Sequence, residues 1–351
     1  MVLVITPIKV RSEFWIIVSI AATFIGTVVG AGFASGQEIY QFFSAQGCNG
    51  LIGLSITVLL LGKAGAKVFA IGRKIRNESY EEFLRFLLGK RLAPVADLIL
   101  FVFFVILMGV MFAGSGTVFA ELGLGYWTGV VGTAVLLLVV LFNELSGLIV
   151  ANLIIIPLMF AGAISVSVFA IQTRCNVLAP GAANLKWLLA ALQFSAYNLV
   201  LSIPVLLSLA KRYPFPRTLN AGGWVGSIGL GIMAALIHWA LLCHLPHLRQ
   251  SPLPMIELAK NVGPAAYFGY AVILWAEMLT TLFANAFGVA KRAAAWTGWP
   301  YRFWVLCFTT VGIIVGQAGF ADLIAGFYPV FGYLSLAILA FILFKTDSTR
   351  T

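Results

Sequence analysis

Residues 26–38 read GTVVGAGFASGQE and interrupt an apolar segment, residues 14–45, that otherwise has the composition of a membrane-spanning helix. Glycines occupy positions 26, 30, 32 and 36, and each interior glycine costs a helix about 1 kcal/mol relative to alanine. Gln37 and Glu38 follow where a spanning helix should remain apolar. Transporters build substrate sites from broken helices with polar groups at mid-membrane depth. We therefore predict that this stretch is the active centre.

The composition places the chain among polytopic membrane proteins. Of its 351 residues, 61% are hydrophobic and only 10% are charged, whereas a soluble domain carries about a quarter charged residues. This excludes a soluble fold and predicts that the lipid bilayer is the surrounding medium. The formal net charge of +10 fits Lys and Arg in cytoplasmic loops, so no nucleic-acid partner is expected.

About ten segments qualify as membrane spans, each of which needs roughly 20 apolar residues. They are approximately 14–45, 49–72, 94–120, 126–143, 146–171, 186–210, 219–243, 265–290, 302–317 and 321–344. If the N-terminus is inside, sixteen of the 22 Lys and Arg residues fall in inner segments and four in outer segments. This asymmetry predicts an even number of spans with both termini in the cytoplasm.

Two connecting segments and the cysteines add further expectations. Residues 73–93 have the pattern of an amphipathic helix on the inner surface, and residues 245–264 end in a short helical pattern that could cap an outer vestibule. Both segments could equally be surface without a role. Cys48, Cys175 and Cys243 share the outer side in this topology, which permits one disulfide without choosing the pair.

The sixth span, residues 186–210, contains a second candidate interruption. Polar side chains cluster at its middle and Pro204 follows them, which predicts a break or kink near residues 197–203. Two interrupted spans at corresponding positions are typical of inverted-repeat transporters. We therefore predict an all-α domain, residues 1–351, made of two inverted five-helix repeats at about 14–171 and 186–344.

The motif GAGFASGQE, residues 30–38, resembles the signature of the YkvI-type bacterial membrane proteins. Residues 26–32 resemble the unwound first helix of the leucine-transporter fold, in the amino acid–polyamine–organocation superfamily. The resemblance covers essentially the whole chain in the number of spans and the positions of the breaks. It implies a secondary transporter of the bacterial cytoplasmic membrane that works by alternating access, coupled to Na⁺ or protons, and not an enzyme.

The resemblance also implies site residues. In that fold a sodium ion is held by carbonyls of the first-span break and hydroxyls of the eighth span, here Gly26, Val29, Thr280 and Thr281 with the Glu277 carbonyl nearby. No other metal and no cofactor are expected. Substrate would lie against residues of the first and sixth spans, namely Val28, Ala31, Gly32, Phe33, Ser35, Phe194, Ser195, Tyr197 and Asn198. Phe33 departs from the sodium-symporter branch, which has an asparagine ligand for a second sodium ion at this position.

The first-span break suits a substrate with charge of both signs. N–H groups freed at the start of the second half-helix favour a carboxylate, and carbonyls freed at the end of the first favour Na⁺ or an ammonium group. A zwitterionic amino acid matches both. The structural alternative is close helix packing, because Gly26/Gly30 and Gly32/Gly36 form small-xxx-small patterns, although packing leaves Gln37 and Glu38 unexplained.

Glu38 and Glu277 are the carboxylates deepest in the predicted spans. An ionised side chain at the bilayer centre costs at least ~2.5 kcal/mol, so each needs a partner, a water-filled cavity or a proton. We predict that Gln37 and Glu38 gate the site or carry the coupled proton, or that Glu38 binds a substrate amine, with helix capping as the structural alternative for Glu38. For Glu277 a coupling role and a structural pair are equally favoured, and Lys63 is predicted to pair with Asp97.

The predicted function is secondary active transport of a small amino acid or related amine, coupled to Na⁺ or H⁺. The partners are then a small-molecule substrate and a coupling ion. The alternative is a channel or a membrane-embedded ligand sensor without coupled transport. No nucleophile–base pair or metal motif in the sequence suggests catalysis. The identity of the substrate, the coupling ion, the direction of transport and the oligomeric state stay open at this point.

Overall fold

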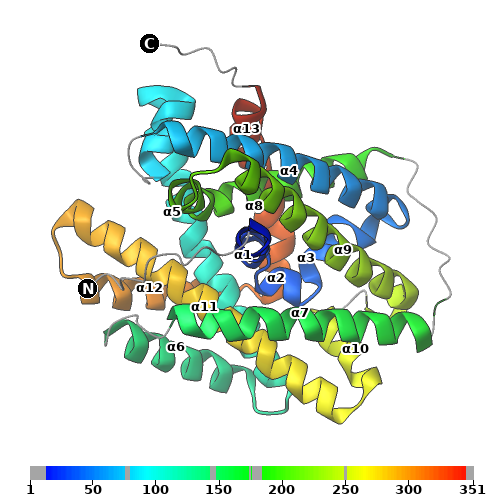
Figure 1. The fold of residues 1–351 in the computed structure, drawn as a ribbon. Helices are drawn as coiled ribbons and strands as arrows, with labels where there is room; N and C mark the ends of the chain where they lie inside the picture. Colours follow the sequence, from blue (N-terminus) through cyan, green and yellow to red (C-terminus); the bar gives the residue numbers. More distant parts are fainter. Residues whose placement is uncertain are drawn as a thin grey trace.

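Helices form the fold in the part of the chain that the structure describes. The structure is a computed structural model that describes residues 13–75, 80–142, 148–173, 175, 184–248 and 251–344. Its helices are α1 (Glu13–Val28), α2 (Ala31–Ala34), α3 (Gln37–Phe42), the 3₁₀ turn η1 (Ser44–Gln46), α4 (Asn49–Lys74), α5 (Tyr80–Glu121), α6 (Tyr126–Phe142), α7 (Leu148–Thr173), α8 (Lys186–Arg212), α9 (Pro216–Leu248), α10 (Pro254–Val262), α11 (Pro264–Thr297), α12 (Tyr301–Gly316) and α13 (Phe320–Phe344) (Figure 1).

The predicted all-α, polytopic fold is confirmed. By length and composition, α4, α5, α8, α9, α11 and α13 could each cross a membrane, and α1, α6, α12 and the part of α7 from Pro157 are shorter apolar helices. Every predicted span coincides with one of these helices, and α1, α2 and α3 together make up the first. The division into two inverted repeats stays a prediction.

The helices pack in two groups that meet around α1. In one group α1 and α4 both pack on α8 and α9, and in the other α5 packs on α6, α11 and α12. Helix α13 contacts both α8 and α5, and α7 contacts both α9 and α11. Figure 1 looks along α1, which lies near the middle of the molecule and is surrounded by the other helices. The broken first span is therefore at the centre of the fold.

Glycines let the helices of the first group approach closely. A Cβ on Gly222 of α9 would lie 2.6 Å from the side chain of Ile20 in α1. One on Gly62 of α4 would lie 2.5 Å from the ring of Trp224 in α9. Small residues at such crossings are the usual means of packing helices in lipid, where no hydrophobic force drives them together.

The connecting segments follow the prediction in outline. Helix α5 begins at Tyr80, and Gly89, with φ of +78°, separates its first turns from the membrane-spanning part, so a helix does form within residues 73–93. The short helix expected near the end of residues 245–264 is α10. A disulfide joins Cys175 to Cys243 and ties the segment after α7 to α9, which selects one of the pairs that the topology permitted.

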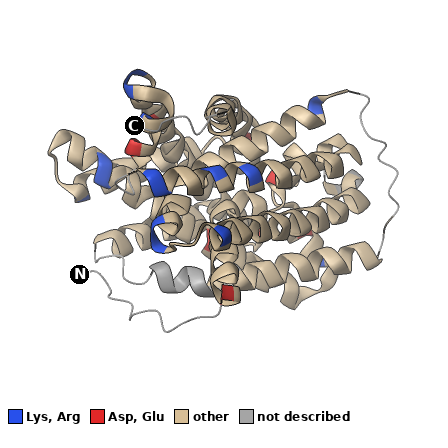
Figure 2. Cartoon of the chain, turned by 45° about the horizontal axis from the view of Figure 1, so that its top comes forward, with Lys and Arg blue, Asp and Glu red and all other residues tan. Residues whose placement is uncertain are grey.

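Basic residues gather toward one end of the helices. Most of the Lys and Arg residues visible in Figure 2 lie in its left half. The residues Lys90 and Arg91 near the start of α5, Lys211 and Arg212 at the end of α8, and Lys291 and Arg292 near the end of α11 define what we call the basic end. This is the end that the sequence predicts to be cytoplasmic.

The predicted interruption of the sixth span is corrected by the structure. Helix α8 runs as one helix from Lys186 to Arg212 and passes through Pro204. Two of the polar side chains that suggested a break bond instead to carbonyls of the preceding turn. Ser195 Oγ donates to the Ala191 carbonyl at 2.7 Å, and Asn198 Nδ2 donates to the Phe194 carbonyl at 3.0 Å. Side chains satisfied in this way do not require an unwound backbone.

Candidate functional site

The first span breaks at Val29 and Gly30. Helix α1 ends at Val28, Gly30 is extended (φ −119°, ψ −172°), and α2 begins at Ala31. A second change of direction follows at Gly36, whose φ of +81° lies in the left-handed region that favours glycine. The end of α1 therefore leaves carbonyl groups without partners inside the helix, directed to the gap before α2.

A cavity of about 300 Å³ lies beside this break. The predicted site residues that line it are Gly26, Val28, Val29, Ala31, Glu38, Tyr197, Asn198, Glu277, Thr280 and Thr281. The structure thus brings both predicted carboxylates, the predicted sodium ligands and part of the predicted substrate surface to one place. We call it the central cavity.

Glu38 is folded back against the broken segment. Its side chain is buried, and Oε2 accepts a hydrogen bond of 2.5 Å from the hydroxyl of Tyr197 on α8. A Cβ at Gly32 would lie 2.1 Å from Glu38 Oε1, so the carboxylate occupies the space that a side chain at position 32 would need. Gly32 therefore belongs to the site as the surface on which Glu38 rests, although it does not line the cavity.

Glu277 lies on α11 on the other side of the central cavity. Only 3% of the residue is exposed, and its Oε2 is buried without a hydrogen-bond partner among the described residues. Its backbone carbonyl accepts a hydrogen bond of 3.0 Å from Thr280 Oγ1. A buried carboxylate oxygen without a partner is costly, and a bound cation or a proton would remove that cost.

The charge of the central cavity has one sign. Two carboxylates, Glu38 and Glu277, are among its lining residues, and no described Lys, Arg or His lines it. Helix α2 has only four residues, so few aligned peptide dipoles stand behind its N–H groups. The site is therefore better suited to a cation than to an anion.

The other predicted site residues lie behind the cavity wall. Phe33 is fully buried in the core, and Ser195 bonds within its own helix. Ser35 Oγ donates to the Gly32 carbonyl at 2.9 Å and accepts from the Gln37 N–H at 3.3 Å, so it stabilises the turn. Phe194 is part of an aromatic cluster with Phe42 and Tyr197, and Gln37 is buried with Oε1 unpartnered among the described residues.

Several lining residues were not predicted. Phe104, Leu107 and Met111 come from α5, whose uniformly apolar sequence carried no signal. Tyr328 on α13 and Asn285 on α11 are polar residues within apolar spans, and that contrast could have identified them. The ion pair predicted between Lys63 and Asp97 is wrong: Asp97 pairs with Arg292, and Lys63 is exposed. Sequence spacing does not reveal which helix faces Asp97.

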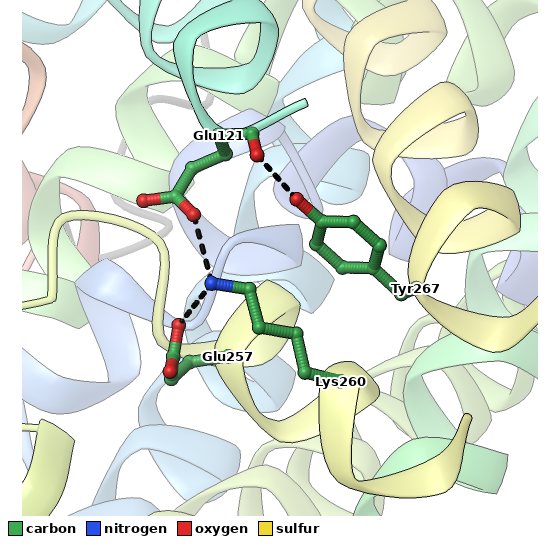
Figure 3. A network of polar contacts seen from close by, with 4 residues as sticks. All are labelled: Glu121, Glu257, Lys260 and Tyr267. Atoms are coloured by element: carbon green, nitrogen blue, oxygen red, sulfur yellow. Dashed lines mark hydrogen bonds and ion pairs between the residues drawn. The ribbon is translucent and has the colours of Figure 1, made fainter. Parts of the chain in front are cut away.

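Helix α10 covers the side of the break opposite to the basic end. The Met255 N–H donates to the Ser35 carbonyl at 2.9 Å, and a Cβ at Gly36 would lie 2.8 Å from Met255 Cγ. Lys260 of α10 donates a hydrogen bond of 3.0 Å to Glu121, which joins α10 to the end of α5, and one of 2.9 Å to Glu257 one turn earlier in α10 itself (Figure 3).

A tyrosine extends this network to α11. The Tyr267 hydroxyl donates to the carbonyl of Glu121, and the Lys260 ammonium lies 5.5 Å from the centre of its ring. The hydrogen bond to Glu257, helped by Glu121, raises the pKa of Lys260 above its usual value. Lys260 therefore stays charged through the neutral range, and its network joins α5, α10 and α11.

The chain is similar to two proteins of Bacillus subtilis strain 168. It is 29% identical over 337 residues to the uncharacterised membrane protein YkvI, covering 94% of this chain and 96% of YkvI. It is 24% identical over 319 residues to the uncharacterised protein YyaD, covering 91% of this chain and 94% of YyaD. No model of a known protein family matches the sequence. The resemblance to YkvI-type membrane proteins is confirmed.

Solved structures of transporters share the fold. Mhp1, a nucleobase–cation symport-1 family transporter in a closed conformation with bromovinylhydantoin bound, aligns with a TM-score of 0.61 at 16% identity, over 92% of this chain and 75% of Mhp1. A manganese transporter of Eremococcus coleocola aligns with a TM-score of 0.61 at 14% identity, over 96% of this chain and 80% of that protein. The leucine-transporter-like fold is confirmed.

Proposed function

We propose that the protein is a secondary active transporter that carries a small amino acid or related amine across the bacterial cytoplasmic membrane by alternating access. The observation that carries the proposal is the central cavity beside a broken helix, lined by Glu38 and Glu277 and, in the part of the chain that the structure describes, by no basic residue. The solved structures of the same fold are transporters, which supports the mechanism but leaves the substrate to the chemistry of the site.

The substrate class follows from this chemistry. An ammonium group presents N–H donors to carboxylates and to the carbonyls freed at the end of α1, and it neutralises buried negative charge. Phe104, Leu107, Met111 and Tyr328 supply apolar and aromatic walls for the rest of the molecule. A cavity of about 300 Å³ is at the lower end of the range for small-molecule sites, which favours a small substrate.

The direct test is uptake by purified protein in liposomes. Labelled amines and amino acids are offered under imposed Na⁺ and H⁺ gradients, and we expect gradient-dependent uptake of at least one amine-bearing compound. The variant Glu38→Gln tests the role of the carboxylate. It keeps the size of the side chain and should reduce uptake at least tenfold. Absence of gradient-dependent uptake for the whole panel would contradict the proposal, and discrete single-channel currents would favour the channel instead.

The coupling ion is decided by two sets of variants. Thr280→Ala combined with Thr281→Ala removes the hydroxyls beside the Glu277 carbonyl and should abolish Na⁺ dependence if Na⁺ drives transport. Glu277→Gln removes the proton acceptor and should abolish pH dependence if protons drive it. Each variant is compared with wild type for thermal stability in detergent, so that unfolding is not mistaken for loss of coupling.

A further inference from the structure

A second cavity, of about 380 Å³, adjoins the central cavity. The two share lining residues on α5 and α11, namely Phe104, Ala284 and Asn285. On α5 and α11 the remaining residues of the second cavity lie closer to the basic end than those of the central cavity, for example Arg292 against Glu277 on α11. The second cavity therefore lies between the central cavity and the basic end.

Each of the three polar side chains that line the second cavity has a hydrogen-bond donor, and among the described residues no Asp or Glu lines it. They are the Tyr80 hydroxyl and the Asn285 amide, which can also accept, and the Arg292 guanidinium, which only donates. The Tyr80 Oη and Asn285 Nδ2 atoms are buried and have no hydrogen-bond partner among the described residues. A buried donor without a partner is costly, so a ligand that supplies an acceptor would be favoured at this position.

The third donor is a guanidinium that is already paired with one carboxylate. Arg292 pairs with Asp97 through one of its nitrogens, and a guanidinium has five N–H groups in a planar fork, so donors remain for a ligand. A carboxylate matches that fork in shape and charge. The rest of the wall is apolar and comes from residues such as Phe101, Val200 and Pro204, which suits a hydrocarbon or aromatic body.

We propose that the second cavity is a separate ligand site for a small molecule that has an apolar body and a carboxylate head. The carboxylate is held by Tyr80, Asn285 and Arg292, and the apolar body packs against α5 and α8. The proposal concerns binding only and does not depend on what the central cavity carries. Because the cavities share Phe104 and Asn285, a ligand here lies directly beside any molecule in the central cavity.

The test measures binding to the purified full-length protein by calorimetry and by thermal stabilisation. The probes are 4-phenylbutyrate and its neutral counterpart 4-phenylbutyramide, and we expect the carboxylate to bind at least tenfold more tightly. Tyr80→Phe should weaken carboxylate binding about tenfold, because it removes one hydrogen bond to a charged group. It should leave the melting temperature of the unliganded protein unchanged, because the hydroxyl it removes has no partner among the described residues.

The chain offers a matched control for this variant. The hydroxyl of Tyr301 on α12 is likewise buried without a partner in the described part of the chain, but it does not line the second cavity. Tyr301→Phe should therefore leave carboxylate binding unchanged. Glu38→Gln should also leave it unchanged, which separates this site from the central cavity.

A second variant tests the space rather than the donor. Gly288 lines the cavity, and a Cβ added there would meet no atom within 4 Å, so Gly288→Leu can be accommodated and would occupy part of the volume. We expect phenylbutyrate to bind at least tenfold more weakly to Gly288→Leu.

A fatty acid tests whether the carboxylate ligand can come from the bilayer. Decanoate is added to the protein in nanodiscs, and Tyr80→Phe should weaken its binding too. Three results would each overturn the proposal. The acid and the amide could bind equally well, neither phenylbutyrate nor decanoate could bind, or both Tyr80→Phe and Gly288→Leu could leave carboxylate binding unchanged.

Discussion

The two ends of the central cavity are built differently. At the end near α10, Glu38 is bonded to Tyr197, and Met255 packs on Gly36 and bonds to the Ser35 carbonyl. At the basic end the central cavity adjoins a second cavity whose Tyr80 and Asn285 donors have no partner among the described residues. Direct contacts close the first end, whereas the second keeps space and unused hydrogen-bonding capacity.

This difference identifies the closed side of the molecule. For alternating access, the α10 end is the one whose contacts must break for the central cavity to open there. Those contacts involve the same residues that bring Glu38 into the cavity, so closing this end and forming the site are one structural event. Substitutions at the α10 end, compared with substitutions elsewhere in the molecule, test this difference.

The largest effect is expected from Gly32→Val. The new side chain would need the space that Glu38 Oε1 and Cδ occupy, at 2.1 and 2.8 Å from the position of a Cβ. Glu38 would lose its contact with Tyr197, and we expect transport or amine binding to fall about 100-fold, as for loss of a charged hydrogen bond at a site. Uptake in liposomes and the melting temperature are measured together.

Gly30→Ala is the control for Gly32→Val. Gly30 has a φ of −119°, which any residue adopts, and a Cβ there would meet nothing within 4 Å. It should retain stability, because the added Cβ displaces no atom. Gly30 also lines the central cavity, so its uptake measures the effect of a small added side chain when Glu38 keeps its place. If Gly32→Val transports as well as Gly30→Ala, then Glu38 does not have to rest on position 32 for function.

The next effect comes from one substitution made at both ends. Tyr197→Phe removes the donor to the buried Glu38 carboxylate and should lower the free energy of unfolding by about 1.5–3 kcal/mol. Tyr80→Phe removes a hydroxyl that has no partner among the described residues and should change it by less than about 0.5 kcal/mol. Denaturant unfolding in detergent measures both. If both variants lost the same unfolding free energy, the hydroxyl at the α10 end would be no more strongly bonded than the one at the basic end.

The contrast between α1 and α8 shows how far sequence reasoning extends. Both spans combine polar residues with helix breakers, yet only the span with several glycines unwinds. Glycine loses more conformational freedom in a helix than any other residue, so a glycine cluster destabilises the helical backbone. In α8, the side chains of Ser195 and Asn198 donate hydrogen bonds to carbonyls of the preceding turn. A hydroxyl or amide at mid-span therefore indicates an unwound helix less reliably than a glycine cluster does.

The central cavity was predictable on three of its walls. Glycines and Glu38 marked the first span, Glu277 marked α11 and mid-span polar residues marked α8, and the resemblance to the leucine-transporter fold assigned their partners. The wall from α5 has only apolar side chains such as Phe104 and Met111, which look the same in a sequence whether they face a cavity, another helix or lipid. The pairing of Asp97 with Arg292 depends on how α5 and α11 are rotated, which periodicity in a uniformly apolar span does not determine.

A smaller effect is expected from Gly36→Ala. An L-residue at φ of +81° costs about 1–2 kcal/mol, and the added Cβ would also displace the Met255 side chain, 2.8 Å away. Gly298→Ala is the matched control, because Gly298 has φ of +74° and open space around its Cβ. The melting temperature should fall further for Gly36→Ala, and the excess measures the contact between α10 and the broken span. No excess would mean that this contact does not stabilise the closed end.

The smallest effect is expected from Lys260→Gln, which removes the ion pairs that hold α10. The Lys260 side chain is 39% exposed, so solvent screening limits the loss of unfolding free energy to about 0.5 kcal/mol. Lys260→Arg keeps the charge and should retain most of it. The loss of unfolding free energy should be smaller in 1 M salt, where the Debye length is only about 3 Å and charges are strongly screened.

The pH dependence of the Lys260→Gln effect has a definite sign. Because the folded pKa of Lys260 is raised above its unfolded value, the contribution of the ammonium group is complete below the unfolded value and is lost only as pH rises through the folded one. The difference between wild type and Lys260→Gln should therefore be constant between about pH 6 and 9 and disappear only at strongly alkaline pH. A difference that changed across neutral pH would assign the stabilisation of α10 to a group other than Lys260.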